Sequence, residues 1–240
     1  MSGHSKWANI KRHKEKQDAA KGKIFTKLIR EITVAARHGT DTNTNSRLRL
    51  AVDKALAQNM TRDTIDRAIK RGAGSSEDTN MEEISYEGYA AGGVAVLVHC
   101  LTDNRNRTAG DVRHAFTKHG GNLGTTGSVS YLFKQRGLIC LPPKSDEDKI
   151  MAITLDTAED IITNDDGSID VFATPENFTK TKNALEKAGI TPALAEISMI
   201  AAIQVALDKG TSETVVGLID ALEDLDDVQN VYSNADNSGY

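Results

Sequence analysis

The hydrophobic pattern of this chain changes at a short polar segment, residues 72–80, and this change constrains the fold more than any other feature. Before the segment, apolar residues recur every three or four positions, which is the spacing of amphipathic helices. After it, short apolar runs predict strands with helices between them. The segment itself holds no apolar residue beyond Ala73. The pattern therefore predicts a helical part followed by an α+β part.

The first part is predicted to contain three helices. Leu28 and Ile32 belong to a run of apolar residues at helical spacing, and Gly39 follows this run as a C-terminal cap. Thr61 has the residue type of an N-cap for the third helix, and Gly72 ends that helix. The expected helices span residues 22–38, 47–59 and 61–72.

The second part alternates between predicted strands and helices. Strands are expected at residues 83–89, 94–101, 129–133, 138–141, 159–163, 168–173, 195–205 and 228–232. Helices are expected at residues 109–119, 149–157, 175–188 and 211–225. From residue 138 to residue 205 the order is β–α–β–β–α–β, which is typical of a ferredoxin-like unit. The last helix and strand would complete the sheet that begins at residue 83.

These elements predict a multidomain protein with helical and α+β domains. A basic helical N-terminal domain is expected at residues 1–75, and an α+β middle domain at residues 80–134 together with 206–240. A ferredoxin-like α+β domain at residues 135–205 would be inserted in the middle domain. No apolar run reaches the roughly 20 residues that span a bilayer. We therefore expect a cytoplasmic protein with no membrane partner.

The charge is divided as sharply as the periodicity. Residues 1–75 hold 17 Lys and Arg residues and 7 Asp and Glu residues, a net charge of +10. The remaining residues hold 12 and 27, a net charge of −15. Such an asymmetry within one chain indicates that one part faces a polyanion. The formal charge of the whole chain, −5, conceals this division.

The basic opening segment, GHSKWANIKRHKEKQDAAKGKIFTKLIR (residues 3–30), is the leading candidate for a binding site. Its cations would attract phosphates, Trp7 would stack on an unpaired base, and Asn9 would bond to a base edge. The candidate nucleic-acid-binding residues are Lys6, Trp7, Asn9, Lys11, Arg12, Lys14, Lys16, Lys21, Lys23, Lys27 and Arg30. In the alternative interpretation, the segment is a solvated amphipathic stretch whose Trp7 docks on the helices.

A second candidate is TDNRNRT (residues 102–108), which lies between a predicted strand and a predicted helix. Its side chains would bind phosphate near the start of the helix. The secondary candidate residues are Asn104, Arg105, Asn106 and Arg107. The alternative is a helix-capping turn in which Asp103 or Asn104 is the cap. Residue spacing favours neither interpretation.

Two further segments are weaker candidates. HGGNLGTTGS (residues 119–128) has glycines that would cradle a phosphate, but it lacks the lysine and hydroxyl residue of a P-loop. LEDLDDVQ (residues 222–229) would bind a metal, although a solvated acidic face with Leu222 and Leu225 turned inward is simpler. No motif places a nucleophile beside a base. We expect no enzyme, catalytic residue, metal site or cofactor, and an enzyme using the glycine-rich segment is the least favoured alternative.

Seven segments carry a resemblance to a known family. They are GHSKWANIKRHKEKQDAAKGKIFTKLIREITVAAR, RLRLAVDKALAQNM, DRAIKRGAG, YEGYAAGGVAVLV, LTDNRNRTAGDVRHAFTKHGGNLG, GSVSYLF and LEDLDDVQNVYSNAD. In the same order and over nearly the whole chain, they resemble the YebC-type proteins, whose relatives include PmpR-like regulators and the mitochondrial translational activator of cytochrome c oxidase. The resemblance implies a helical N-terminal domain followed by two α+β domains, the third inserted in the second.

The resemblance also implies a function in gene expression. It implies either a transcriptional regulator that binds DNA or a translation factor that contacts ribosomal RNA at the ribosome, for example during synthesis of proline-rich stretches. The lack of a clear recognition helix weakens sequence-specific reading of DNA, and a basic segment with a tryptophan suits irregular RNA. We expect a nucleic-acid-binding regulator of transcription, with the ribosome as the alternative partner. The sequence predicts no oligomeric state.

Overall fold

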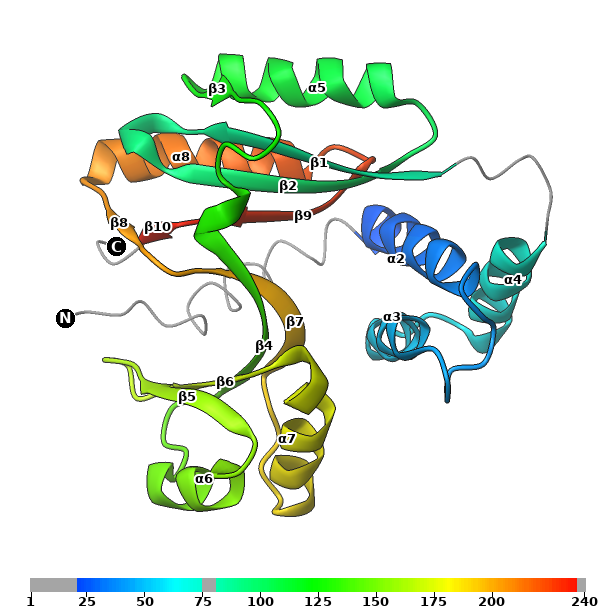
Figure 1. Cartoon of the computed structure of the whole chain (residues 1–240), viewed down its shortest axis with the longest axis vertical. Coiled ribbons are helices and arrows are strands. Elements are labelled where there is room, and N and C mark those ends of the chain that lie inside the picture. Colours follow the sequence, from blue (N-terminus) through cyan, green and yellow to red (C-terminus); the bar gives the residue numbers. More distant parts are fainter. Residues whose placement is uncertain (1–20, 75–80, 237–240) are drawn as a thin grey trace.

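The computed structural model describes residues 21–74 and 81–236, and residues 1–20, 75–80 and 237–240 lie outside the described part. Within the described part, the chain is a mixed α/β protein with two four-stranded sheets, in each of which all strand pairs are antiparallel. Figure 1 shows three N-terminal helices beside the two sheets, with further helices packed on each sheet.

The N-terminal helices are α2 (Lys21–Ala36), α3 (Ser46–Ala57) and α4 (Arg62–Ala73). Asn45 caps α3 by accepting a hydrogen bond from Leu48 N, and Thr61 caps α4 by accepting one from Thr64 N. Their shared core consists of Ile32, Ala35, Ala36, Leu48, Ala51, Ala55, Met60, Ile65 and Ala68. The three helices predicted from the periodicity are therefore confirmed, and each boundary differs by at most two residues.

Helices α2 and α4 approach each other most closely at Gly72. A Cβ atom at this position would lie 2.1 Å from the carbonyl oxygen of Thr33 and 2.9 Å from Cβ of Ala36. Because neither a carbonyl oxygen of a helix nor a buried methyl group moves easily, this site tolerates only glycine. Gly72 therefore does not end the helix as predicted, since α4 continues to Ala73 with Gly74 as its C-cap; instead it allows the helix pair to pack.

We expect Gly72→Ala to lower the free energy of unfolding by about 2 kcal/mol, because the new methyl group overpacks the contact between α2 and α4. Chemical denaturation followed by circular dichroism measures the change. The matched control is Gly110→Ala, an exposed helical position where a Cβ atom would meet no atom within 4 Å. There alanine should raise the free energy of unfolding by about 0.5–1 kcal/mol. Equal effects at the two positions would contradict the packing argument.

The first sheet has the strand order β3-β1-β2-β9. Its strands are β1 (Glu82–Tyr89), β2 (Ala95–Thr102), β3 (Asn122–Leu123) and β9 (Val228–Ser233). Helices α5 (Arg105–Lys118) and α8 (Lys209–Glu223) cover one of its faces (Figure 1). The terminal helix and strand therefore join the sheet that begins with β1.

Strand β2 is buried on both of its faces. Val96 and Val98 pack beneath α5 and α8 with Phe116, whereas Ala95 and Leu97 pack on the other side. A strand with two covered faces needs a continuous apolar run rather than an alternating one. This explains the run from residue 94 to residue 98 and the burial of Cys100, whose thiol pKa is raised to about 12 by desolvation.

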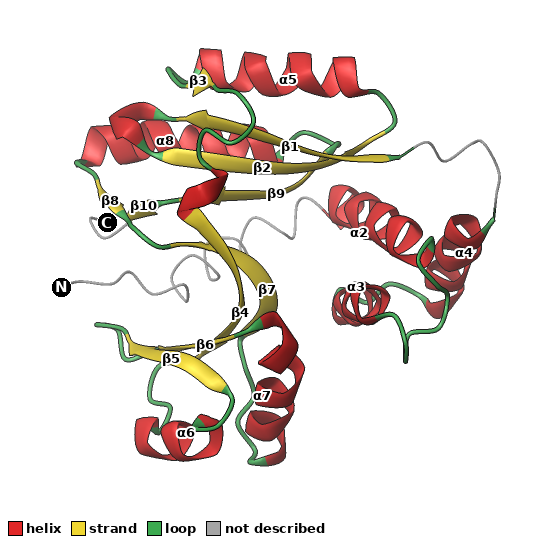
Figure 2. Ribbon diagram, viewed as in Figure 1, coloured by secondary structure: helices red, strands yellow, loops and turns green. Residues whose placement is uncertain are grey.

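The second sheet has the strand order β5-β6-β4-β7. Its elements are β4 (Phe133–Leu141), α6 (Glu147–Thr154), β5 (Ala158–Thr163), β6 (Ile169–Ala173), α7 (Pro175–Lys187) and β7 (Leu194–Ala201). Helices α6 and α7 lie on the same side of this sheet (Figure 2). Their core with the sheet includes Ile139, Leu141, Val171, Phe178 and Leu185. The proposed division into domains at residues 1–75, 80–134 with 206–240, and 135–205 stays a prediction.

Several boundaries differ from the sequence predictions. The strand expected at residues 129–133 is instead a short 3₁₀ turn, Ser130–Leu132, that leads directly into β4. The strand expected at residues 195–205 ends at Ala201, and β8 (Val205–Ala206) pairs separately with β10 (Ala235–Asp236). Helix α5 begins at Arg105 rather than at residue 109 because Asn104 is its N-cap. Because α5 starts four residues earlier than predicted, Arg105 and Asn106 belong to the helix.

Candidate nucleic-acid interface

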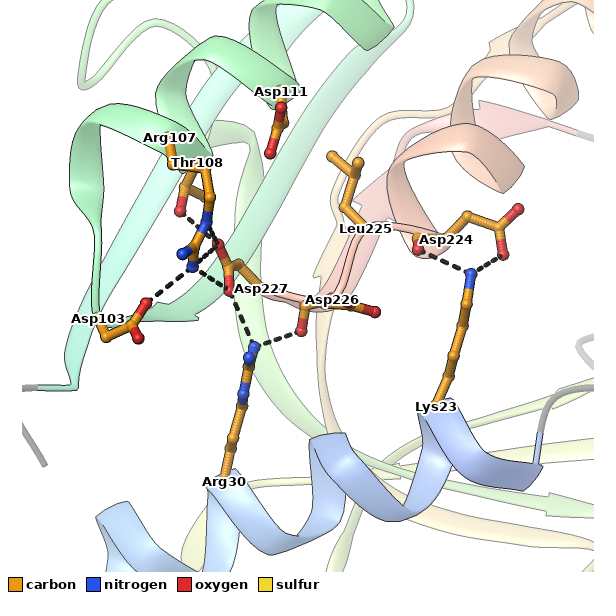
Figure 3. Close-up of a pocket in the computed structure, with 10 residues that line it drawn as sticks. All are labelled: Lys23, Arg30, Asp103, Arg107, Thr108, Asp111, Asp224, Leu225, Asp226 and Asp227. Carbon is orange, nitrogen blue, oxygen red and sulfur yellow. Dashed lines mark hydrogen bonds and ion pairs between the residues drawn. The ribbon is translucent and has the colours of Figure 1, made fainter. Parts of the chain in front are cut away.

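Lys23, Lys27 and Arg30 of α2, which were predicted to bind phosphate, contact the acidic segment at the end of α8 and directly after it. Figure 3 shows Lys23 and Arg30 in this position. Lys23 Nζ lies 3.1 Å from the carbonyl oxygen of Asp224 and 3.3 Å from its carboxylate. Lys27 Nζ donates to the carbonyl oxygen of Glu223 at 2.7 Å, and desolvation by burial lowers the pKa of Lys27. The last carbonyl groups of a helix carry partial negative charge and attract cations. Both lysines therefore hold α2 against α8.

Asp227 is the centre of the contact between α2 and the first sheet. Its carboxylate accepts hydrogen bonds from Arg30 Nη1 at 3.0 Å and from Arg107 Nη2 at 2.8 Å. The hydroxyl groups of Thr108 and Thr102 donate to it at 2.8 Å and 3.2 Å. The side chain of Asp227 is only 7% exposed. One buried carboxylate thus joins α2, the end of β2 and the first turn of α5.

The partners of Asp227 keep its carboxylate charged. Burial opposes ionisation, but the hydrogen bonds from Arg107 and Thr108 and the charges of Arg107 and Arg30 outweigh it. The pKa of Asp227 is therefore held below its ordinary value. Hydrogen bonds to Asp227 and Asp103 raise the pKa of Arg107 in turn. At neutral pH the cluster is an ionised network rather than a neutral one.

An open cleft of about 550 Å³ lies between α2, the start of α5 and the segment 224–227 (Figure 3). Its lining residues are Lys23, Arg30, Asp103, Arg107, Thr108, Asp111, Asp224, Leu225, Asp226 and Asp227. Five carboxylates outnumber three cations in this lining. An excess of negative charge repels phosphates. The cleft is therefore a poor site for a nucleic acid, although all three of its cations were predicted to bind one.

The TDNRNRT segment serves two purposes in the structure. Asn104 Oδ1 accepts a hydrogen bond from Arg107 N at 3.0 Å, as the capping interpretation predicts. The guanidinium group of Arg107 binds Asp227 and Asp103. The side chains of Arg105 and Asn106 are exposed. Of the four secondary candidates, two thus stabilise the fold and two face solvent.

The glycine-rich segment is occupied by a carboxylate of the chain itself. Glu87, which is 3% exposed, accepts hydrogen bonds from the backbone N–H groups of Gly127 at 2.8 Å and of Val129 and Ser130 at 2.7 Å. Burial opposes its ionisation, but these donors outweigh burial and lower the pKa of Glu87. The N–H groups that a phosphate would use are thus already bonded, which argues against the nucleotide-binding alternative.

The remaining candidates divide by their place in the chain. Lys6, Trp7, Asn9, Lys11, Arg12, Lys14 and Lys16 lie outside the described residues, and Lys21 is the first residue of α2.

Leu222 is buried as predicted, but Asp227 is buried as well, so the acidic segment 222–229 is not simply a solvated face. Among the described residues, no group of three or more His, Cys, Asp or Glu side chains could hold a metal ion. None of the helices in the described part is long and apolar enough to cross a membrane.

Sequence reasoning missed the roles of Asp227 and Glu87. Asp227 directly precedes strand β9, whose first residue, Val228, is buried; this is a weak signal that a carboxylate in an acidic run is not solvated. Glu87 gives no signal, because its partners lie about forty residues further along the chain.

Comparisons with known proteins cover nearly the whole chain. Residues 5–75 match the family described as "TACO1/YebC protein N-terminal domain", and residues 81–235 match "TACO1/YebC second and third domain". A "Probable transcriptional regulatory protein" of Coxiella burnetii is 63% identical over 238 residues and covers 98% of both chains. A protein of the same name from Hahella chejuensis is 59% identical over 237 residues and covers 98% of this chain and 96% of the relative.

A crystal structure supports the same relationship. A conserved hypothetical protein from Aquifex aeolicus superposes with a TM-score of 0.81 at 45% sequence identity, over 91% of each chain. The agreement in sequence and in fold extends over the helical part and both sheets. This chain therefore belongs to the TACO1/YebC family.

Proposed function

We propose that this protein is a cytoplasmic regulator of transcription that binds DNA through its basic N-terminal part. The observation that carries the proposal is the charge of that part, which is +10 over residues 1–75 against −15 for the remaining residues. The regulatory names of the relatives support it. Because a polyanion is repelled by the acidic remainder, contact through the basic part is favoured.

The described structure narrows which cations are available to a phosphate. Lys23, Lys27 and Arg30 point toward the end of α8 and bond there. A nucleic acid that used them would have to replace these internal partners. We therefore propose that Lys6, Lys11, Arg12, Lys14 and Lys16 make the main phosphate contacts, and that Trp7 stacks on a base or sugar.

One observation favours the alternative target, ribosomal RNA. Lys23, Lys27 and Arg30 of α2 are bonded to other parts of the protein, so these three cations do not form a free basic face that could enter a groove of duplex DNA. Binding would then depend on a basic segment and on the phosphate backbone, which suits folded RNA as well as DNA. The proposal is therefore tested with both polymers.

Replacing Lys6, Lys11, Arg12 and Lys14 together by alanine should weaken binding to a DNA duplex of about 30 base pairs or to ribosomes. The slope of log K against log salt should become shallower by about 3.6 if all four cations contact phosphates, because each phosphate contact contributes about 0.9 on duplex DNA. Fluorescence anisotropy over a range of salt concentrations measures the duplex, and co-sedimentation measures ribosomes.

The matched control for this experiment removes the same charge elsewhere: Lys180, Lys182, Lys187 and Lys209 lie on α7 and α8. Their alanine variant should keep both the affinity and the salt slope. An unchanged affinity of the N-terminal variant for both polymers, or an equal loss in the control, would refute the proposal. A loss on ribosomes alone would select the translational alternative.

A further inference from the structure

Helix α5 has an outward face that the fold does not use. Its buried residues are Thr108, Val112, Ala115 and Phe116, which pack toward the sheet. Because α5 begins at Arg105, the residues Asn106, Gly110, Arg113 and Thr117 follow one another at helical spacing on the opposite side. All four are exposed. Figure 1 shows α5 at the outer edge of the molecule, with its other side against the sheet.

This face and the two ends of α5 carry positive charge and hydrogen-bond donors. Arg113 lies on the face, Arg105 is the first residue of α5 and Lys118 is its last. All three are exposed, and their side chains form no hydrogen bond or ion pair with any part of the chain that the structure describes. The one carboxylate of α5, Asp111, lines the cleft instead. The face therefore differs in sign from the acidic remainder of the α+β part. Such a set of cations and donors is suited to phosphate oxygens.

Gly110 is the least expected residue of this face. It lies inside α5, where glycine is less favourable than alanine. A Cβ atom at this position would meet no atom within 4 Å, and its backbone φ is not positive. Neither packing nor backbone geometry therefore requires glycine here. Its neighbours one turn away are Asn106, Arg107, Arg113 and His114, so it leaves a bare stretch of helix backbone among polar side chains.

We infer that the outward face of α5 binds the sugar-phosphate backbone of a nucleic acid. The inference rests on the proposed function and adds a second contact surface, distant in sequence from the basic opening segment. Arg105 and Arg113 would bind phosphates through their guanidinium groups, and Asn106 would add an amide donor. The absence of a side chain at Gly110 would let the backbone of the polymer approach the helix closely.

The Gly110 position allows folding and binding to be separated. Gly110→Ala and Gly110→Gln should keep or raise the melting temperature, because both residues favour a helix. The glutamine variant should bind a duplex of about 30 base pairs about fivefold more weakly, and the alanine variant should show a smaller loss. The matched control is Asn183→Gln on α7, another exposed helical position. If Gly110→Gln binds as tightly as the wild type, the inference is overturned.

The charge of the face is tested by Arg105→Ala combined with Arg113→Ala. Affinity for the duplex or for ribosomes should fall about tenfold, and the salt slope on the duplex should become shallower by about 2. Lys180→Ala with Lys187→Ala removes equal charge from α7 and should change neither quantity.

Three other outcomes would overturn the inference. If the N-terminal alanine variant loses binding while the α5 variants keep it, this inference fails and the proposed function stands. If the wild-type protein binds neither DNA nor ribosomes, both fail. If polyglutamate competes as well as nucleic acid of equal charge, the face binds an acidic protein instead.

Discussion

Asp227→Asn is expected to lower the free energy of unfolding by about 3 kcal/mol, the typical cost of breaking a buried ion pair. Asparagine has nearly the same volume, but its amide N–H₂ would point toward groups that are themselves donors. Arg107, Arg30 and the hydroxyl group of Thr108 would then compete for one remaining oxygen in place of a charged carboxylate. Because these donors come from different elements, the loss should loosen α2 as well as the start of α5.

The measurement combines chemical denaturation with hydrogen exchange. Exchange should become faster in α2 and in the first turn of α5, while α7, which packs on the other sheet, should keep its protection. Asp224→Asn is the matched control, because this exposed carboxylate lies on the same segment and pairs with Lys23 at 3.3 Å. An exposed pair contributes at most about 1 kcal/mol. Equal effects of the two variants would show that Asp227 does not join the elements.

Glu87→Gln should cost a similar free energy, about 3 kcal/mol, for a different reason. The carboxylate of Glu87 accepts three backbone hydrogen bonds from the segment 127–130. A glutamine side chain has one oxygen, and its N–H₂ group would face N–H donors. Buried backbone groups would then remain unpaired. The glutamine variant should also increase proteolysis within the segment 124–130, and Glu82→Gln, an exposed position on the same strand, should do neither.

Lowering the pH should reduce the free energy of unfolding through the same two carboxylates, Glu87 and Asp227. The pKa values of Glu87 and Asp227 lie below their ordinary values of 4.5 and 3.8, so the unfolded chain binds more protons in this range. Their contribution to stability is present above about pH 5 and is lost as the pH falls through the lowered pKa values. The free energy of unfolding of the Glu87→Gln variant should therefore fall less between about pH 5 and pH 3 than that of the wild type. Parallel curves would contradict this assignment.

Local signals in the sequence predicted most elements of the described part. Thr61 and Asn104 have the residue type of an N-cap, and both side chains accept the expected backbone hydrogen bond. Periodicity placed the N-terminal helices because their cores are formed by residues three and four apart. The strand expected at residues 129–133 was wrong. There, hydrogen bonds to Glu87 hold Val129 and Ser130 in a tight turn, and no local pattern encodes a partner so far away.

The sequence also predicted the positive charge of the N-terminal part, but it did not predict which of these cations are bonded within the protein. Lys23, Lys27 and Arg30 were expected to bind phosphate together with the opening segment. The structure instead places them against residues 223–227, almost 200 positions further along the chain. Conversely, Arg105 and Asn106 were already secondary candidates, and the early start of α5 places Asn106 in line with Gly110 and Arg113.

The sequence by itself determined most of the order of elements, the division of charge and membership of the family, because each depends on neighbouring residues or on their sum. Only the tertiary structure decided which charges are available. Asp227 and Glu87 are buried inside the protein. Arg107 is bound through its guanidinium group to Asp227, although its side chain is partly exposed, whereas Arg113 is left in solvent. The physical reason is that a charged side chain is either neutralised or solvated by what surrounds it in space, and most of those surroundings are distant in sequence.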